Sequence, residues 1–274
     1  MFTAQSLAKT ADTNAPILIF DSGIGGLSVM QEVKRALPYA PIVYAADHAG
    51  LPYGEKSEAE IAARVPALLG RLVERYSPRL VAIACNTACT IALSHVRAAL
   101  NLQVVGTVPA IKPATLITKT GVIGLLGTQA TIRQPYVDQL ESEFASGMTL
   151  LRHGAGELVH AAEAKMRGVS VDAAIYQNAI DGLRTQKGGA KMDVVILGCT
   201  HFPLLTAELN KAAPTIEFVD GAKGIARRIA YLSEGQEWPD IEPAFHFVTT
   251  TNPETIADYL PRLAKYGFSR IDGL

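Results

Sequence analysis

Short apolar runs rich in β-branched residues alternate with longer amphipathic segments along most of the chain. The runs predict buried strands, and the segments between them predict helices. Such alternation is typical of a parallel sheet that is covered by helices on both faces. In the first part of the chain the predicted strands are 17–20, 42–46, 80–84 and 103–105, and the predicted helices are 27–37, 57–76 and a stretch that begins after residue 85.

The pattern starts again near the middle of the chain. The run 122–126 with its turn Gly127-Thr128 resembles the opening strand 17–20, and the run 194–197 resembles 80–84. This similarity of residue types, rather than of identities, indicates a weak internal repeat. The further predicted elements are helices at 130–144, 156–166, 173–185, 223–232 and 253–265 and strands at 215–219 and 245–250.

Four residues with reactive or hydrogen-bonding side chains come at the ends of predicted strands: Asp21, Cys85, Thr128 and Cys199. In an open parallel sheet, ligands bind beyond the carboxyl ends of the strands. We therefore expect the functional site at these strand ends.

Cys85 and Cys199 are the most informative residues of the chain, because each ends a β-branched run at corresponding places in the two repeats. A single buried cysteine is usually inert packing. Two thiols that face one pocket suit a reaction with two matched proton carriers, such as the inversion of a carbon centre. We expect the helices after them to lower their thiol pKa values.

The third cysteine, Cys89, has the character of a small buried hydrophobe. Three cysteines do not suggest a disulfide framework. No compact second pair of His or Cys accompanies Cys85 and Cys89, so the sequence does not predict a zinc site.

Polar side chains next to the two strand-end cysteines can bind a carboxylate. Asn86, Thr87 and Thr200 offer hydrogen-bond donors. His201, two residues after Cys199, can support proton transfer. A lone histidine is often structural, so the role of His201 stays open on these grounds alone.

The turn Gly23-Ile24-Gly25-Gly26 after the first strand allows two interpretations. A dinucleotide-binding turn needs a third glycine where this chain has Ser28, although Asp47 stands roughly where a ribose-binding acid would. A better match is an anion site of backbone N–H groups, with Ser22 as a further donor and Asp21 as the acceptor for an ammonium group. A simple helix cap at Asp21 or Ser22 is the structural alternative.

The 274 residues suffice for one large or two medium domains, and 49% of them are hydrophobic and 19% charged. A net charge of -1 argues against a dominant nucleic-acid surface, and no apolar run is long enough to span a membrane. The segment 1–15 is polar and lacks the apolar core of a secretory signal. We expect a cytoplasmic protein with a disordered extension at residues 1–14.

Several short motifs together resemble the bacterial glutamate racemases, which belong to the aspartate/glutamate racemase family. They occur in the order typical of that family, and the resemblance extends from about residue 15 to the C-terminus. Each motif alone is modest, whereas the ordered set is specific. The motifs are Phe20-Asp21-Ser22-Gly23-Ile24-Gly25-Gly26, Pro52-Tyr53-Gly54, Ala84-Cys85-Asn86-Thr87-Ala88 and Gly198-Cys199-Thr200-His201.

The resemblance implies an α/β protein with two Rossmann-like or flavodoxin-like parallel-sheet domains, related by pseudo-twofold symmetry, and an active site between them. Residues 15–108 and 220–274 would form the first domain, and residues 109–219 the second. It also implies an enzyme without cofactor or metal that interconverts L- and D-glutamate, supplies D-glutamate for peptidoglycan and forms a homodimer.

The resemblance also implies roles for single residues. Cys85 would deprotonate D-glutamate with Asp21 as its assisting group, and Cys199 would deprotonate L-glutamate with His201 as its assisting group. Tyr53 has a simpler alternative role as an anchor of its loop. The residues implied to line the substrate are Asp21, Ser22, Pro52, Tyr53, Gly54, Asn86, Thr87, Thr128, Thr200 and His201.

The chain departs from its relatives at a few positions. His160 follows a Leu-Val pair where they often have an acid, so we assign no catalytic acid to Glu157 or Glu163. Lys112 stands where they often have Glu, and Phe202 where Tyr is usual.

Four alternatives stay open. A racemase for aspartate or another amino acid would share both cysteines, but aspartate racemases more typically have Glu at the position of His201. A non-catalytic binding protein on the same fold leaves both thiols unexplained. A thiol hydrolase that uses Cys199 and His201 leaves Cys85 unexplained. A nucleotide-dependent oxidoreductase ranks last because of the imperfect glycine pattern.

Overall fold

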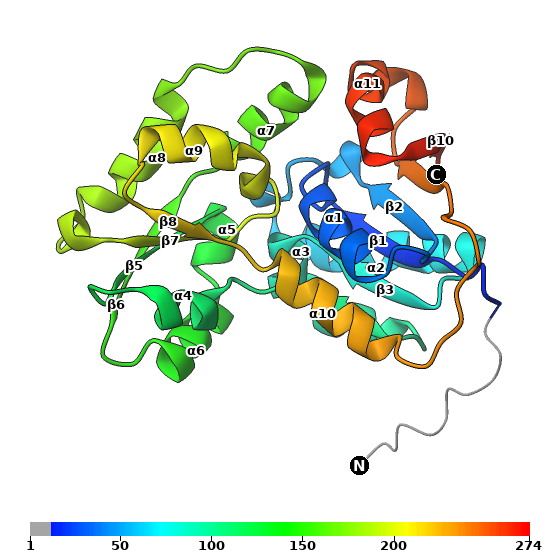
Figure 1. Ribbon diagram of the computed structural model, residues 1–274, viewed down its shortest axis with the longest axis horizontal. Coiled ribbons are helices and arrows are strands. Elements are labelled where there is room, and N and C mark those ends of the chain that lie inside the picture. Colours follow the sequence, from blue (N-terminus) through cyan, green and yellow to red (C-terminus); the bar gives the residue numbers. More distant parts are fainter. Residues whose placement is uncertain (1–11) are drawn as a thin grey trace.

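The computed structural model describes residues 12–274, and the predicted extension 1–14 lies outside the described residues except for its last three. Two separate sheets organise the chain, one in each of two domains that lie side by side (Figure 1). Every pair of neighbouring strands is parallel. The predicted α/β class with two parallel-sheet domains is confirmed.

The first domain is built on a six-stranded sheet in the order β10-β9-β2-β1-β3-β4. Four strands come from the first part of the chain, and the C-terminal part adds two more at one edge. The strands are β1 (Ile17–Asp21), β2 (Ile42–Ala46), β3 (Leu80–Ile83), β4 (Val104–Gly106), β9 (Phe245–Thr249) and β10 (Phe268–Gly273).

The second domain has a four-stranded sheet in the order β6-β5-β7-β8. Its strands are β5 (Val122–Gly127), β6 (Thr149–Gly154), β7 (Val194–Leu197) and β8 (Glu217–Val219). When the strands of each domain are numbered in chain order, both sheets contain the spatial order second, first, third, fourth. In the first domain, β9 and β10 extend the sheet beyond the second strand. This flavodoxin-like order in both sheets gives the internal repeat a structural basis.

Helices cover both faces of each sheet, because each has an apolar stripe that must be buried. In the first domain these are α1 (Leu27–Ala36), α2 (Glu58–Tyr76), α3 (Asn86–Ala99) and α10 (Ala222–Leu232), with the short α11 (Leu260–Leu263). In the second domain they are α4 (Ile111–Ile117), α5 (Gln129–Ile132), α6 (Pro135–Phe144), α7 (Glu157–Arg167), α8 (Ala174–Arg184) and α9 (Thr206–Ala212).

Alternate residues of a strand point to opposite faces of the sheet and pack into different hydrophobic cores. In β1, Ile17 and Ile19 pack with α1 and α10, while Leu18 and Phe20 pack with α2 and α3. In the second domain α7, α8 and α9 share a core with one sheet face, and α4 and α6 cover the other. All five residues of β1 are buried, which holds the end of this strand, Asp21, inside the protein.

Two long helices of the sequence prediction are interrupted in the structure. The predicted helix 130–144 is divided into α5 and α6 because Pro135 disfavours a helical conformation at the residue before it. The predicted helix 253–265 is a series of short turns with a non-helical residue at Ile256. Strands β6 and β10 were not predicted. Among the described helices, none is long and apolar enough to cross a membrane.

Candidate active site

The carboxyl ends of the two sheets face each other across the boundary between the domains. Asp21 ends β1, and its Oδ2 accepts a hydrogen bond of 3.0 Å from Thr200 Oγ1, which follows β7. Thr87 at the start of α3 lies 3.0 Å from Thr128 at the end of β5, oxygen to oxygen. The structure thus brings the predicted strand-end residues of both halves into one interface.

Gly25 makes the close approach of the two domains possible. A Cβ atom at this position would lie 2.5 Å from His201 Nδ1 and 2.7 Å from the backbone nitrogen of the same residue. Real side chains do not come this close to backbone atoms. The glycine turn after β1 therefore serves as a packing surface for the turn that carries Cys199, Thr200 and His201.

Cys85 is the N-cap residue of α3 and is 5% exposed. Its Sγ lies 3.8 Å from Ser22 Oγ. Burial, together with the nearby charge of Asp21, raises the pKa of the Cys85 thiol well above its ordinary value, although the Ala88 N–H at the helix start opposes this. The expectation that the helix lowers this pKa is wrong in net effect, because desolvation outweighs the helix terminus.

Asp21 is fully buried and holds the glycine turn together. Its Oδ1 accepts a hydrogen bond of 2.6 Å from the Ser22 backbone N–H, and its Oδ2 accepts one from Gly26 N–H. Burial raises the pKa of the Asp21 carboxyl, while the charge of His201 and the Thr200 hydroxyl oppose the rise. Asp21 thus fixes the turn that leads into α1 and lies beside Cys85. The predicted cap at Asp21 or Ser22 is not observed, because the N-cap of α1 is Gly26 and it has no side-chain cap.

The second thiol has a different environment. Cys199 Sγ lies 3.9 Å from His201 Nδ1, and His201 Nε2 lies 2.8 Å from Glu163 Oε1. Burial opposes a charge on His201, but the hydrogen bonds to Cys199 and Glu163 and the Glu163 charge raise its pKa well above the ordinary value. The imidazolium form of His201 is therefore stabilised beside Cys199.

Glu163 is the residue that the sequence did not identify. It lies on α7 and is 3% exposed. Burial opposes its ionised form, yet the hydrogen bond and charge of His201, followed by the charge of His48 and the Ile24 N–H, lower the pKa of its carboxyl. The available signal was an acidic side chain on the apolar stripe of an amphipathic helix, where an unpaired charge would be costly.

Three threonine hydroxyls form a closed triangle at the domain boundary. Thr87 lies 3.0 Å from Thr128 and 3.2 Å from Thr131, and Thr128 lies 3.0 Å from Thr131, each measured between Oγ1 atoms. Next to Thr87, the buried Oδ1 atom of Asn86 has no hydrogen-bond partner in the described part of the chain. A buried acceptor without a partner indicates a place for a ligand or a water molecule.

Tyr53 is buried, and its hydroxyl donates a hydrogen bond of 2.6 Å to Asp47 Oδ2. Asp47 also accepts from Arg64 and from Thr250 Oγ1, at 2.7 Å and 2.6 Å on Oδ1. These bonds fix the Pro52-Tyr53-Gly54 loop against the first domain, which fits the role of Tyr53 as a loop anchor. They also engage Asp47 fully, which argues against a ribose-binding acid.

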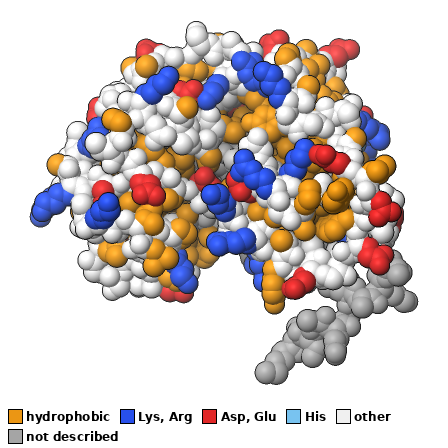
Figure 2. Space-filling view, in the orientation of Figure 1, with side chains coloured by type: hydrophobic (Ala, Val, Ile, Leu, Met, Phe, Trp, Pro, Cys, Tyr) orange, Lys and Arg blue, Asp and Glu red, His pale blue; other side chains and the backbone are white. Residues whose placement is uncertain are grey.

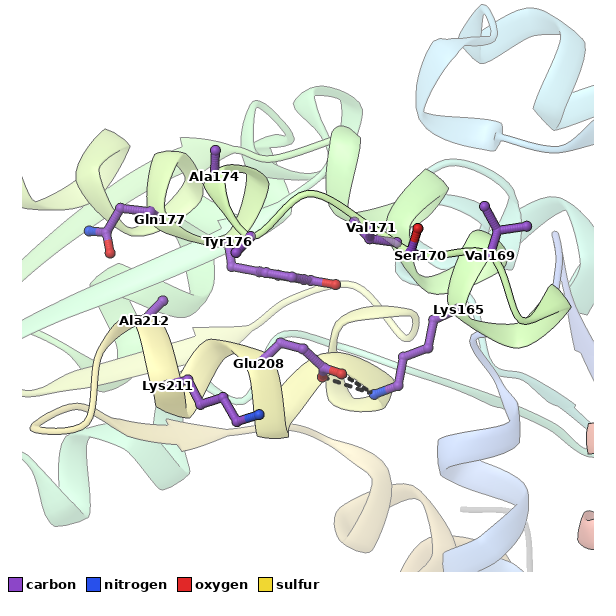
Figure 3. A pocket seen from close by; sticks show the side chains of 11 residues that line it. Lys165, Val169, Ser170, Val171, Ala174, Tyr176, Gln177, Glu208, Lys211 and Ala212 are labelled. Atoms are coloured by element: carbon purple, nitrogen blue, oxygen red, sulfur yellow. Dashed lines mark hydrogen bonds and ion pairs between the residues drawn. The ribbon is translucent and has the colours of Figure 1, made fainter.

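Two further concave surfaces lie away from the thiols. One is a groove of about 930 Å³ between the domains, where Lys112, Lys223, Arg227 and Arg228 are among the lining residues, and Figure 2 shows Lys and Arg side chains near the centre of that face. The other, of about 640 Å³, lies on the second domain, where Lys165 bonds to Glu208 (Figure 3). Neither is lined by Cys85 or Cys199.

All three cysteines are buried free thiols. Cys89 accepts a hydrogen bond from Thr107 N–H at 3.1 Å and donates one to the Ile83 carbonyl at 3.2 Å, as expected of a packing residue. Within residues 12–274 no group of three or more His, Cys, Asp and Glu side chains is arranged to hold a metal ion.

Residues 17–229 match the Asp/Glu/hydantoin racemase family. The chain is 60% identical over 260 residues to a glutamate racemase of Sphingopyxis alaskensis, covering 94% of this chain and 97% of that protein. It is 42% identical over 275 residues to a glutamate racemase of Escherichia coli O157:H7, with 98% and 94% of the two chains covered.

Two solved structures share the fold. The crystal structure of Escherichia coli glutamate racemase in complex with L-glutamate and the activator UDP-MurNAc-Ala has a TM-score of 0.86 at 40% identity and covers 95% of this chain and 98% of that one. A glutamate racemase isoform from Bacillus anthracis has a TM-score of 0.82 at 26% identity, with 96% and 98% covered.

A pair of sheets with thiols at corresponding strand ends thus occurs here in a chain that belongs to the aspartate/glutamate/hydantoin racemase family, a class of isomerases. Within that family the chain groups with the glutamate racemases, and its predicted classification as an amino-acid racemase is confirmed. The assignment of individual site residues stays a prediction, which the geometry above makes specific.

Proposed function

We propose that this chain interconverts L-glutamate and D-glutamate by two-base proton transfer between Cys85 and Cys199. The observation that carries the proposal is the placement of two buried free thiols at corresponding strand ends of two facing sheets. The names of the relatives indicate glutamate as the substrate. The thiols have different partners, Asp21 for Cys85 and His201 for Cys199, which supports a different role for each thiol in the reaction.

In the L-to-D direction, the thiolate of Cys199 removes the α-proton and becomes a thiol. The electron pair stays at the α-carbon, which becomes planar and is stabilised as an enolate by hydrogen-bond donors in a site without bulk water. The thiol of Cys85 then donates its proton to the opposite face, giving D-glutamate and a Cys85 thiolate. The reverse reaction uses the same groups with exchanged roles, and solvent exchange resets the two sulfurs.

The two thiols lie in different electrostatic surroundings. Burial and Asp21 raise the pKa of Cys85, so this sulfur is held as a proton-bearing thiol. The hydrogen bonds to Cys199 and Glu163 raise the pKa of His201 and favour its imidazolium form next to Cys199. The two faces of a substrate bound between the thiols would therefore meet different surroundings, a proton-bearing Cys85 on one side and the His201 imidazolium beside Cys199 on the other.

The polar side chains between the thiols match an amino acid. We assign the partnerless Asn86 Oδ1 to the substrate ammonium group and the hydroxyls of Thr87, Thr128 and Thr131 to a carboxylate, which replaces their mutual hydrogen bonds. Ser22 and Thr200 offer further hydroxyls near the thiols. The predicted lining role of Pro52, Tyr53 and Gly54 is part of this proposal.

The closed geometry suits the chemistry but not the entry of substrate. Cys85 and Cys199 are only 5% and 7% exposed. We infer that the domains separate to admit glutamate and close again to exclude water. The hydrogen bonds that cross the boundary, such as the one from Thr200 to Asp21, break and re-form in each cycle.

We further propose that the protein acts in the cytoplasm as a homodimer and supplies D-glutamate for peptidoglycan, without nucleic-acid or membrane partners. Light scattering on a size-exclusion column measures the oligomeric state. Depletion of the protein in its host, followed by rescue with D-glutamate, tests the cellular role. A persistent monomer, or growth arrest that D-glutamate does not relieve, would contradict the respective part.

The direct test is incubation of the purified protein with L-glutamate in heavy water without added cofactor. Circular dichroism follows the inversion, and proton NMR follows loss of the α-proton. We expect D-glutamate that carries α-deuterium, no activity in Cys85→Ser and Cys199→Ser, and near wild-type activity in the matched control Cys89→Ser. Inversion of aspartate but not glutamate would change the substrate, and silence with every amino acid would refute the proposal.

A further inference from the structure

The carboxylate of Glu163 is held from both domains. Oε1 receives the His201 ring nitrogen at 2.8 Å and the Ile24 N–H at 3.1 Å, while Oε2 receives the hydroxyl of Tyr259 at 2.9 Å. Glu163 and His201 belong to the second domain, whereas Ile24 and Tyr259 belong to the first. Glu163, which orients His201, is thus itself oriented by residues of the other domain.

Tyr259 lies in a segment for which the sequence analysis predicted a helix but no function. It ends the 3₁₀ stretch Pro253–Tyr259 between β9 and β10 and is 5% exposed. Its ring stands against the His48 ring at a centroid distance of 5.4 Å, and the Arg167 guanidinium lies 5.9 Å from its centroid. These contacts fix the ring so that the hydroxyl points at Glu163.

From this geometry we propose that Tyr259 is a positioning residue for the Cys199 half of the site, acting through Glu163 and His201. The inference rests on the proposed function, because it assumes that Cys199 is one of the two bases. The single donor of Tyr259 occupies Oε2, which leaves Oε1 turned toward His201 and Ile24. The arrangement exists only when the domains are closed, so closure and orientation of His201 coincide.

Within residues 12–274, no equivalent relay supports the half of the site around Cys85. Its assisting group, Asp21, is held by backbone N–H groups of its own turn and by Thr200. Tyr259 therefore supports one thiol of the pair and not the other. Burial and the Glu163 charge raise the pKa of the Tyr259 phenol, which keeps it a hydrogen-bond donor throughout the working pH range.

Removing the hydroxyl has a defined electrostatic consequence. A donor to a carboxylate favours its charged form, so Tyr259→Phe raises the pKa of Glu163 from its lowered value. Activity should then fail at a higher pH as the solution is acidified. The titratable or charged groups that face Glu163 and His201 from the surrounding elements are Asp21, Tyr44, His48, Arg167, Cys199 and Tyr259.

Arg262 provides a matched control on the same segment. Its guanidinium donates to the Met166 carbonyl on α7 at 3.3 Å, so it also joins the two domains, but it does not touch Glu163. Arg262→Ala tests whether any weakened closure produces the same effect. Only loss of the Tyr259 hydroxyl should move the acid limb of the pH profile.

The experiment measures kcat, KM and their pH dependence for L- and D-glutamate in wild type, Tyr259→Phe and Arg262→Ala, with thermal unfolding as a second readout. We expect kcat of Tyr259→Phe to fall about three- to tenfold, the loss of one ordinary hydrogen bond, with a smaller change in KM. The acid limb of kcat and the acid-side loss of thermal stability should both move to higher pH. If Tyr259→Phe does not fold, Tyr259→Leu replaces it.

The inference is overturned if Tyr259→Phe has the same kcat and the same pH profile as wild type. An equal displacement of the acid limb in Arg262→Ala would do so too, because it would assign the effect to closure alone. The ionisation of the substrate is common to all three proteins and cancels in the comparison. If wild type does not racemise glutamate, the proposed function fails first, and the two failures are therefore distinguishable.

Discussion

Asp21 and Thr200 are joined by a hydrogen bond of 3.0 Å that crosses the boundary between the two domains. Asp21 stands beside one thiol, and Thr200 directly follows the other. The turn that carries the assisting group of Cys85 thus touches the turn that carries Cys199. Catalysis should therefore be sensitive to any change that keeps these turns apart.

Gly25→Ala is the sharpest test of this dependence. The added carbon would lie 2.5 Å from His201 Nδ1 and 2.7 Å from a backbone nitrogen, which cannot move aside without shifting the whole turn. We expect activity to fall by about a hundredfold or more, as for an ångström-scale misplacement of reacting groups. The control is Gly70→Ala, at a helical position with open space around it. Equal activity of the two variants would show that closure does not need this approach.

Glu163→Gln should weaken both activity and stability. The variant keeps a hydrogen-bonding group but removes the charge that stabilises the His201 imidazolium, so we expect a loss of about a hundredfold in kcat/KM. Because the enantiomers of glutamate have equal free energies, kcat/KM must fall equally in both directions. Glu157→Gln, an exposed position on the same helix, is the control. A fall confined to one direction would indicate an error in the assay rather than in the enzyme.

The stability of the same variant has a predictable pH dependence. The pKa of Glu163 lies below 4.5, so its contribution is present above that value and is lost as the pH falls through the folded-state pKa. The pKa of His201 lies well above 6.5, so its contribution is complete below that value and is lost as the pH rises through the folded-state pKa. Both contributions are present between pH 4.5 and 6.5.

In that window, Glu163→Gln should lower the free energy of unfolding by about 3–5 kcal/mol, and by less at higher pH. Urea unfolding at several pH values measures the difference from wild type. A difference that grows steadily toward alkaline pH would contradict the assignment of a buried ion pair.

The sequence predicted the parts of the site that local pattern controls. Asp21, Cys85, Thr128 and Cys199 could be placed at strand ends because a run of apolar residues ends at or just before each of them. Their arrangement across two facing sheets followed from the family resemblance rather than from local pattern. Interruptions such as the one at Pro135 were underestimated because amphipathic periodicity continues across the break.

The contact between Glu163 and Tyr259 could not be predicted in this way. They are separated by 96 positions in the chain, and they meet only because β9 and the segment after it return to the first domain. An acid on a helix and a tyrosine in a loop are ordinary surface residues unless the tertiary fold buries them together. The long-range packing of α7 against residues 253–259 is therefore the information that the sequence pattern did not contain.

Asp21→Asn should change the ionisation of Cys85. The Asp21 charge is one of the causes, after burial, that raise the pKa of this thiol, so its removal should let the thiolate form at lower pH. Ultraviolet absorbance of thiolates during a pH titration measures the step, and its absence in Cys85→Ser identifies the sulfur. Racemisation should nevertheless decrease about a hundredfold, because the variant lacks the carboxylate that assists proton transfer at Cys85. An unchanged titration would show that the Asp21 charge does not affect the ionisation of Cys85.

Variants with a single thiol should retain half of the reaction. In Cys199→Ala, Cys85 can still remove the α-proton of D-glutamate, exchange it with heavy water and return deuterium to the same face, so D-glutamate gains deuterium without inversion. In Cys85→Ala the same exchange should be confined to L-glutamate through Cys199. Proton NMR of each enantiomer with each variant gives four measurements, of which two should be positive. Exchange should be slower than racemisation by wild type, because both thiols lie in a closed site with little access to solvent. Exchange of both enantiomers by one variant would mean that a single group reaches both faces, and the opposite pairing would reverse the roles of the two cysteines.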